Sequence, residues 1–159
     1  MPRTATAIHQ LLAPERVRVG LPGDGKEDVV NALLDLLEGH PAIADLKEVR
    51  KAVWAREEDL STGVGKGLGL PHAKTSAATG TAAAFAITET PVDFAAIDAE
   101  PVRLVFLLVG TEAAKSEHIR ILSRISRLVS RRGLREELMQ AETPEDVLAA
   151  FAEAERALA

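Results

Sequence analysis

Ser61-Thr-Gly-Val-Gly-Lys-Gly-Leu-Gly-Leu-Pro-His-Ala-Lys-Thr75 is the stretch around which this chain is organised. Glycines occupy every second position from 63 to 69, and glycine allows backbone N–H groups to approach a bound group closely. Pro71 fixes its own φ and holds Leu70 extended, so that His72 is presented from a stiff platform. An imidazole held rigidly beside bare amide groups indicates a site that handles an anion.

Composition excludes several other kinds of protein. The 159 residues are expected to form a single domain, 1–159, with a core that needs no covalent staples. Cysteine is absent, which excludes disulfides, thiolate metal sites and a cysteine nucleophile. There is no apolar signal-peptide core and no apolar run of ~20 residues, so we expect a cytoplasmic protein without membrane insertion. A net charge of −5 argues against general nucleic-acid binding.

Hydrophobic periodicity predicts alternating strands and helices. Strand patterns cover 16–21, 68–71, 82–87 and 102–109. Helical spacing covers 26–38, 45–57, a long helix from about residue 113 to a break at Gly133, and 134–140. Residues 102–109 are apolar almost throughout, as in a strand buried on both faces. Residues 89–101 are predicted to form a loop with a short extended piece at 92–94. The whole chain is therefore predicted to be one α/β unit.

Local signals refine this assignment at the chain's helix ends. Thr143 is the predicted N-cap of a last helix, with Pro144 in its first turn and Asp146 at the capping-box position. His40 ends the helix 26–38, where an imidazole can meet free carbonyl groups, and we interpret it as structural or exposed. His9 receives the same interpretation. His118 falls in the first turns of the long helix, at the edge of its apolar face.

The chemistry available to His72 favours phosphoryl transfer. Neutral imidazole is a good nucleophile near neutral pH, and a phosphoryl group on its nitrogen passes readily to another nucleophile. Such transfer needs positioning and donors that stabilise spread negative charge. The backbone N–H groups of 63–67, including Gly63 and Gly65, could supply these donors. The hydroxyls of Ser61 and Thr62, the cation Arg56 and the imidazole of His118 are the candidate side chains.

Each of these features also has a purely structural interpretation. Alternating glycines before Pro-His can simply form a tight loop, and His118 can be a satisfied histidine at a helix end. Arg56 can be a solvated charge. The Gly-Lys pair at 65 and 66 is not a phosphate-binding Walker loop, because the required spacing and the following Ser or Thr are missing. The residues alone leave an active site and a structural loop about equally supported.

The stretch 61–74 resembles the active-site signature of the fructose/mannitol-type enzyme IIA domain of the bacterial phosphoenolpyruvate-dependent phosphotransferase system. The nitrogen-regulatory IIA proteins share this signature. The similarity continues in Ala-Arg-Glu-Glu-Asp at 55–59, in Glu-Thr-Pro-Val-Asp-Phe at 89–94, in Ile-Asp-Ala-Glu-Pro-Val at 97–102 and in Ser-Glu-His-Ile-Arg-Ile-Leu-Ser at 116–123. It covers roughly residues 11–151, and the combination is highly specific.

The resemblance implies roles for three side chains. It makes His72 the phosphoacceptor, His118 the assisting histidine and Arg56 the active-site arginine. It implies a mixed β-sheet flanked by helices on both sides, the phosphocarrier HPr as donor, and a IIB domain as acceptor when sugar is transported. It implies neither a metal nor an organic cofactor. A regulatory branch, as in the nitrogen-regulatory members, would use the phosphorylation state of His72 to control binding to target proteins. The sequence does not distinguish the two branches, and it does not identify a sugar.

Three other interpretations of the same residues have less support. A pure interaction module without transfer chemistry fits poorly with the presence of His72, His118 and Arg56 together. A metal site of His72, His118 and His40 lacks tight ligand spacing. A nucleic-acid stripe could be formed by six arginines of the C-terminal third. We predict instead that they form a solvated outer face, because Glu117, Glu136 and Glu137 lie nearby and the chain is acidic. They are Arg120, Arg124, Arg127, Arg131, Arg132 and Arg135.

Overall fold

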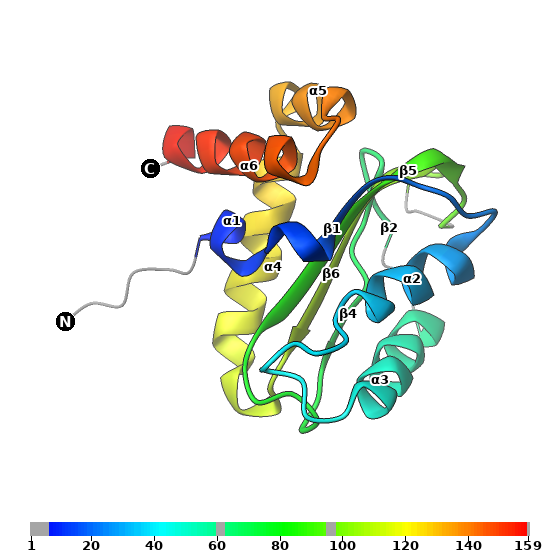
Figure 1. Cartoon of the computed structure of the whole chain (residues 1–159), viewed down its shortest axis with the longest axis vertical. Coiled ribbons are helices and arrows are strands. Elements are labelled where there is room, and N and C mark those ends of the chain that lie inside the picture. Colours follow the sequence, from blue (N-terminus) through cyan, green and yellow to red (C-terminus); the bar gives the residue numbers. More distant parts are fainter. Residues whose placement is uncertain (1–6, 60–62, 95–97, 159) are drawn as a thin grey trace.

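A computed structural model describes residues 7–59, 63–94 and 98–158 (Figure 1). Its centre is a six-stranded sheet in which β1, β5, β6, β3 and β2 follow one another, and β4 also pairs with β6. The pairs β1–β5, β3–β6 and β4–β6 are parallel, whereas β5–β6 and β2–β3 are antiparallel. The predicted mixed sheet is confirmed. The strands are β1 Val17–Leu21, β2 Gly63–Gly65, β3 Leu68–Gly69, β4 His72–Lys74, β5 Ala82–Val92 and β6 Val102–Gly110.

Helices cover both faces of this sheet, as predicted (Figure 1). On one face lie α1 Ile8–Leu11, α4 Lys115–Val129, α5 Arg132–Gln140 and α6 Pro144–Leu158. The other face is covered by α2 Lys26–Asp35 and α3 Leu46–Asp59. Two short 3₁₀ turns, η1 Pro14–Arg16 and η2 Glu112–Ala114, precede β1 and α4.

The central strands are almost wholly apolar because both of their faces are buried. Along β6, the even-numbered residues 104–108 pack into the core under α4 and α6, while the odd-numbered residues 105–109 pack under α2 and α3. Successive side chains of a strand point to opposite faces, so a strand covered on both sides has no polar face. The prediction that residues 102–109 form a strand buried on both faces is confirmed.

Several predicted boundaries differ from the structure by a few residues, and two of them matter for the fold. Strand β5 does not end at Ile87 but continues to Val92, which pairs with Val102 after a shift in register. Val92 and Phe94 are almost fully buried and hold this extension against the sheet, so the predicted loop begins later than residue 89. Helix α2 ends at Asp35 and is followed by turns rather than continuing to residue 38.

The break between α4 and α5 also differs from the predicted position at Gly133. Gly133 lies in the first turn of α5, and the chain turns at Arg131, whose backbone is extended. Arg135 explains the position, because its guanidinium donates hydrogen bonds of 2.8 Å to the carbonyl oxygens of Val129 and Ser130. A cation that caps these last carbonyls stabilises the end of α4.

Capping at the start of α6 follows the prediction. The backbone N–H of Asp146 donates to the Thr143 hydroxyl at 3.1 Å, and the Asp146 carboxylate accepts the N–H of Thr143 at 3.2 Å. His40 differs in detail, because its Nδ1 accepts the N–H of Ala42 at 3.0 Å instead of meeting carbonyl groups. His40 and His9 are both structural, since His9 is held by the buried carboxylate of Glu155.

Candidate functional site

Strand β4 places His72 beside the central strand of the sheet. His72 pairs in parallel register with Leu108 of β6. Side chains alternate along β4, so the buried Ala73 packs under α2 and α3 while His72 and Lys74 point to the opposite face. That face is the one covered by α4. His72 is partly buried, whereas Lys74 is exposed.

The ring of His72 is fixed by the backbone two residues before it. Its Nδ1 lies 2.7 Å from the carbonyl oxygen of Leu70. A carbonyl oxygen can only accept, so the Nδ1 atom carries the proton and donates it. In neutral imidazole the other nitrogen, Nε2, then holds the free lone pair. The Leu-Pro-His order therefore selects the tautomer of His72 as well as its direction.

Helix α4 brings the second histidine to the first. His118 is the fourth residue of α4 and is only 3% exposed. Its ring centroid lies 5.8 Å from that of His72, and the two ring planes are tilted by 47°. The sequence placed His118 at the edge of the apolar face; it lies inside that face, in contact with the other candidate histidine.

Gly110 makes room for this arrangement, and sequence reasoning missed it. A Cβ atom at Gly110 would lie 2.6 Å from Nδ1 of His118, closer than real Cβ contacts come. Gly110 is the last residue of β6, after eight residues of which most are buried and apolar. A glycine ending such a strand signals the close approach of another group.

Both ring nitrogens of His118 are buried and have no hydrogen-bond partner among the described residues. Buried polar atoms are nearly always hydrogen-bonded, and exceptions concentrate at functional sites. A neutral imidazole always has one N–H to donate. The pair thus presents the lone pair of His72 Nε2 and, from His118, one unused N–H and one unused lone pair.

Electrostatics keep both rings neutral at physiological pH. Burial, together with smaller effects of the neighbouring His72 and Lys74, lowers the pKa of His118 to about 4. Burial also lowers the pKa of His72, although its bond to Leu70 opposes this effect. Arg56 and Lys74 lower the pKa of His72 through their charges, while Glu57 raises it. A neutral His72 retains the lone pair that a nucleophile needs.

The last turn of α3 contributes charged groups that act on His72. Arg56 is partly buried there, and its charge acts on His72. Glu57 is only 5% exposed and forms an ion pair with Lys26 of α2. The ammonium group of Lys26 also lies 5.3 Å from the centroid of the Phe94 ring. The sequence singled out Arg56 but missed Glu57, whose only signal was a carboxylate on the apolar face of a helix.

The glycine stretch forms a β-hairpin. Strands β2 and β3 pair antiparallel, with Gly63 opposite Gly69 and Gly65 opposite Leu68. Lys66 and Gly67 form the turn with φ values of 57° and 76°, as in hairpin turns whose two central residues both have positive φ. The N–H of Lys66 is taken by the carboxylate of Asp98 at 3.0 Å. This hydrogen bond occupies one of the backbone N–H groups that we had predicted to bind an anion.

Gly69 has a packing role in this stretch. A Cβ at Gly69 would lie 2.8 Å from the ring of Phe94. The hydroxyl candidates Ser61 and Thr62 lie outside the described residues, and the phosphoryl-binding roles of Gly63 and Gly65 remain predictions. The third histidine of the rival metal site, His40, is engaged with Ala42. Within 7–59, 63–94 and 98–158 no three His, Cys, Asp or Glu residues are placed to hold a metal ion.

Comparison with known proteins gives a consistent result. A family model described as "Phosphoenolpyruvate-dependent sugar phosphotransferase system, EIIA 2" matches residues 10–154. The chain is 36% identical over 151 residues to the "PTS system fructose-specific EIIA component" of Haloferax volcanii, covering 93% of this chain and 98% of that protein. It is 32% identical over 141 residues to the "PTS system fructose-specific EIIABC component" of Bacillus subtilis, covering 89% of this chain but 22% of that protein.

Solved structures extend the comparison to three dimensions. The nitrogen regulatory protein IIA-Ntr of Neisseria meningitidis superimposes with a TM-score of 0.84 at 30% identity, covering 91% of this chain and 98% of that one. The enzyme IIA of a mannitol IIA–phosphorylated IIB complex from Escherichia coli has a TM-score of 0.77 at 19% identity, covering 89% and 97%, and shares the fold. Fold and matches together define a component of the phosphoenolpyruvate-dependent sugar phosphotransferase system. Within that system, the chain belongs to the EIIA type 2 family. None of the helices in its described residues is long and apolar enough to cross a bilayer.

Proposed function

We propose that this chain is a phosphoryl carrier that accepts phosphate from phospho-HPr on Nε2 of His72. In this step the bond between phosphorus and the donor's histidine nitrogen breaks as the bond between phosphorus and Nε2 forms. The proton on Nδ1 of His72 stays in place, donated to Leu70. No water or cofactor is consumed, because one phosphorus–nitrogen bond replaces another.

The observation that carries this proposal is the 2.7 Å contact between Nδ1 of His72 and the carbonyl oxygen of Leu70. It leaves Nε2 as the nucleophilic nitrogen of a neutral ring. The same contact stabilises the phosphorylated ring. A phosphoryl group on Nε2 draws electron density from the ring, which strengthens the hydrogen bond that Nδ1 donates to Leu70. A histidine held only for structure would need no second, unpartnered histidine beside it.

His118 and Arg56 take supporting roles in the proposal. Phosphoryl transfer spreads negative charge over three oxygens, which positioned donors stabilise. His118 donates its one N–H to a phosphoryl oxygen as a neutral imidazole, since its pKa of about 4 keeps it uncharged at pH 7. Arg56, whose charge already acts on His72, supplies a cation. Gly63, Gly65, Ser61 and Thr62 complete the predicted set of donors.

For the onward step we propose transfer from His72 to a IIB domain, followed by uptake of a fructose- or mannitol-type sugar. This branch is supported by the similarity to a fructose-specific EIIA component along nearly its whole length. The alternative is a regulatory protein in which the phosphorylation of His72 controls binding to target proteins. That branch is favoured by the likeness to IIA-Ntr, at a TM-score of 0.84.

The experiment is phosphorylation with phosphoenolpyruvate, enzyme I and HPr, followed by addition of candidate IIB domains. We expect an acid-labile, alkali-stable label on the wild-type chain and none on His72→Ala. The control His40→Ala should be labelled as the wild type is. Label remaining on His72→Ala at the wild-type level would overturn the assignment. Passage of the label to a IIB domain supports the transport branch, and its retention with every IIB domain tested supports the regulatory branch.

A further inference from the structure

Lys26 is a cation at the end of a helix that disfavours cations. It is the first residue of α2 and follows Gly25, an N-cap that makes no side-chain hydrogen bond. The unpaired N–H groups and the dipole of a helix make its N-terminus favourable for anions. The side chain of Lys26 is also mostly covered, with 24% of its surface exposed. Residues that break local rules in this way are expected at functional sites.

Two contacts of its ammonium group explain the position of Lys26. The first is the ion pair with the buried carboxylate of Glu57, in the last turn of α3. The second is the ring of Phe94, whose centroid lies 5.3 Å from Nζ, a distance at which the face of an aromatic ring attracts a cation. Lys26 thus joins the start of α2 to the end of α3 and to the segment that follows β5.

Phe94 connects Lys26 with the backbone that precedes His72. Phe94 is fully buried, and a Cβ at Gly69 would lie 2.8 Å from its ring. The ring therefore packs directly on the backbone of β3, one residue before Leu70. The carbonyl oxygen of Leu70 accepts the proton of Nδ1 of His72. A displacement of Phe94 would consequently disturb the acceptor that fixes the tautomer of His72.

Glu57 connects Lys26 with the site by a second route. Glu57 follows Arg56 in the last turn of α3, and the charges of both residues act on His72 in opposite directions. A buried carboxylate that loses its counter-ion is strongly unfavourable, so the turn would rearrange if Lys26 were absent. The ion pair between Lys26 and Glu57 therefore fixes where this turn lies, and with it the backbone of Arg56.

We propose, on the basis of the proposed function, that Lys26 is a positioning residue of the phosphoryl-transfer site. Together with Glu57 and Phe94, it holds the last turn of α3 and the backbone before His72 to the start of α2. Arg56 and His72 thereby keep the geometry that transfer needs, while Lys26 itself does not touch the phosphoryl group. Reaction rates fall steeply when reacting groups are displaced by even about 1 Å, so the loss of this anchor slows transfer.

The test replaces Lys26 by methionine, which keeps most of the length of the side chain but removes its charge. Per folded molecule, we expect Lys26→Met to lower the saturating rate of transfer from phospho-HPr by about tenfold to a hundredfold. The half-saturating donor concentration should stay within about twofold of the wild type, because Lys26 acts on the reaction step. Lys26→Arg keeps the cation and should recover most of the rate.

Lys51→Met is the matched control. Lys51 forms an exposed pair with Glu48 at 3.5 Å on the surface of α3. Breaking this pair removes the same kind of charge from the same region without disturbing a buried carboxylate. The saturating rate and the half-saturating donor concentration should both remain those of the wild type.

The imidazole of His72 gives a readout that a merely stabilising contact would not change. Nitrogen NMR of the ring distinguishes its two neutral tautomers. In the wild type we expect the form protonated on Nδ1, because the carbonyl oxygen of Leu70 accepts that proton at 2.7 Å. In Lys26→Met a measurable share of the form protonated on Nε2 should appear, since the acceptor for Nδ1 is no longer held in place.

A second variant keeps the test valid if Lys26→Met does not fold. Lys26→Met with Glu57→Gln removes both charges, which folded proteins tolerate better than the removal of one. It should show the same slow transfer and mixed tautomers. A wild-type rate at saturation, or an unchanged tautomer, in either folded variant would overturn the positioning role and leave the proposed function standing. If phospho-HPr does not label the wild type, the proposed function fails, and the tautomer populations still decide whether Lys26 positions His72.

Discussion

Gly110 is the residue that lets the two histidines meet, because a Cβ at this position would lie 2.6 Å from Nδ1 of His118. We expect Gly110→Ala to push the His118 ring away from His72 while the chain still folds. Transfer from phospho-HPr should slow by about tenfold, and His118→Ala sets the limit at ~100-fold, the typical loss of one donor to the transition state. The measurement is rapid-quench labelling of His72.

The matched control for Gly110→Ala is Gly133→Ala. A Cβ at Gly133 meets nothing within 4 Å, and this residue lies in the first turn of α5. It should leave the transfer rate unchanged and stabilise the chain slightly, by up to ~1 kcal/mol. Wild-type transfer by Gly110→Ala, with the His118 ring signals unshifted in NMR spectra, would show that the packing at this position tolerates a methyl group.

Burial of a neutral His118 makes stability depend on pH. The pKa of about 4 in the folded chain lies below the ordinary histidine pKa of 6.5, so the unfolded chain binds more protons between these values. Stability from this group is therefore complete above pH ~6.5 and is lost as the pH falls toward 4. The shift of about 2.5 corresponds to roughly 3 kcal/mol.

The check compares wild type with His118→Gln, which does not titrate. Urea unfolding at pH 7 and at pH 4.5 should show the wild type losing about 2 kcal/mol more than the variant. The other acid-sensitive groups are common to both chains and cancel in the comparison. An equal loss in the two chains would mean that His118 becomes protonated without cost, and that its ring is open to water.

At the scale of elements, Glu155 joins three helices. Its carboxylate accepts the N–H groups of Ile8 and His9 at 2.7 and 2.9 Å, meets Nδ1 of His9 at 2.8 Å, and pairs with Arg124 at 3.2 Å. Burial raises the pKa of Glu155, but the bonds from His9 and Ile8 outweigh it and the pKa is lowered. This contact holds α1 against α6 and α4.

We expect Glu155→Gln to destabilise the chain by about 2 to 4 kcal/mol, because a buried carboxylate with four donors is replaced by an amide that cannot satisfy them. Amide hydrogen exchange should become faster at Ile8 and His9 than in the rest of the core. Glu153→Gln, an exposed change on the same helix, is the control and should change neither property. Unchanged exchange at Ile8 would show that apolar packing alone secures α1.

Element types followed from the sequence more securely than their ends. Period and apolar content identified β6 and the long helices, because both faces of the sheet are covered and burial dictates the pattern. The end of β5 could not be predicted, since Thr88, Glu89 and Thr90 interrupt the apolar run while Val92 and Phe94 return to the core. The break before α5 was placed at Gly133, although the side chain of Arg135 sets it through contacts that no local pattern contains.

In the candidate site, too, the residues with a local sequence signal could be predicted and those that depend on distant contacts could not. His72 and its stiff approach could be identified because Leu-Pro-His is a local signal with a local consequence. Glu57 and Gly110 could not, since their roles come from Lys26 and His118, which are distant or depend on how α4 packs. The alternating glycines allowed a tight loop, and the pairing of β2 with β3 makes that loop a hairpin.

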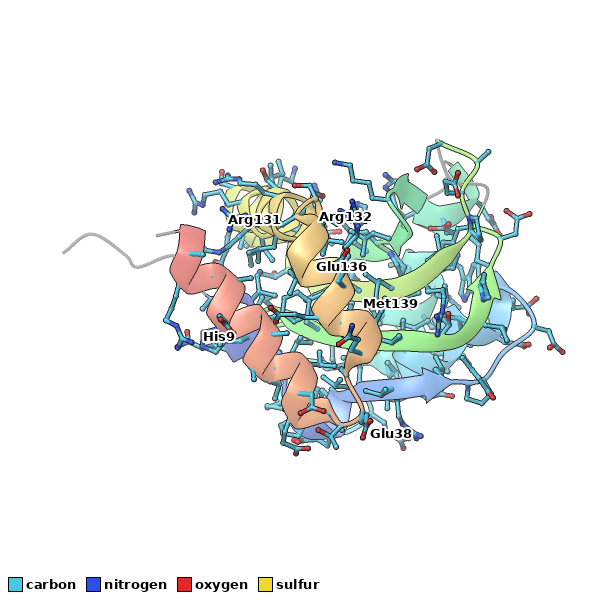
Figure 2. The ribbon with its side chains drawn as sticks, turned by 90° about the horizontal axis from the view of Figure 1, so that it is seen from above. His9, Glu38, Arg131, Arg132, Glu136 and Met139 are labelled. Atoms are coloured by element: carbon cyan, nitrogen blue, oxygen red, sulfur yellow. The ribbon has the colours of Figure 1, made fainter. Side chains whose placement is uncertain are left out.

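For the whole molecule, the distribution of charge bears on which partners it can bind. The chain carries 24 acidic and 19 basic residues, yet its arginines gather on α4 and α5. Arg131 and Arg132 lie where these helices meet, with Glu136 and Met139 farther along α5 (Figure 2). Arg132 pairs with Glu136 at 2.9 Å. A continuous row of free cations, as a duplex would need, does not run across this surface.

We therefore expect no tight binding of duplex DNA at physiological ionic strength. The dissociation constant should be larger than roughly 10⁻⁴ M, the upper end of the range for non-specific binding. Net negative charge repels the phosphate backbone from most of the molecule, and Arg124, Arg132 and Arg135 are occupied within the chain. Fluorescence anisotropy with a labelled 20-base-pair duplex, titrated at two salt concentrations, measures this. Glu136→Lys frees Arg132 and should strengthen binding if charge alone limits it. Micromolar, salt-sensitive binding by the wild-type chain would instead show that the arginines of α4 and α5 form a nucleic-acid surface.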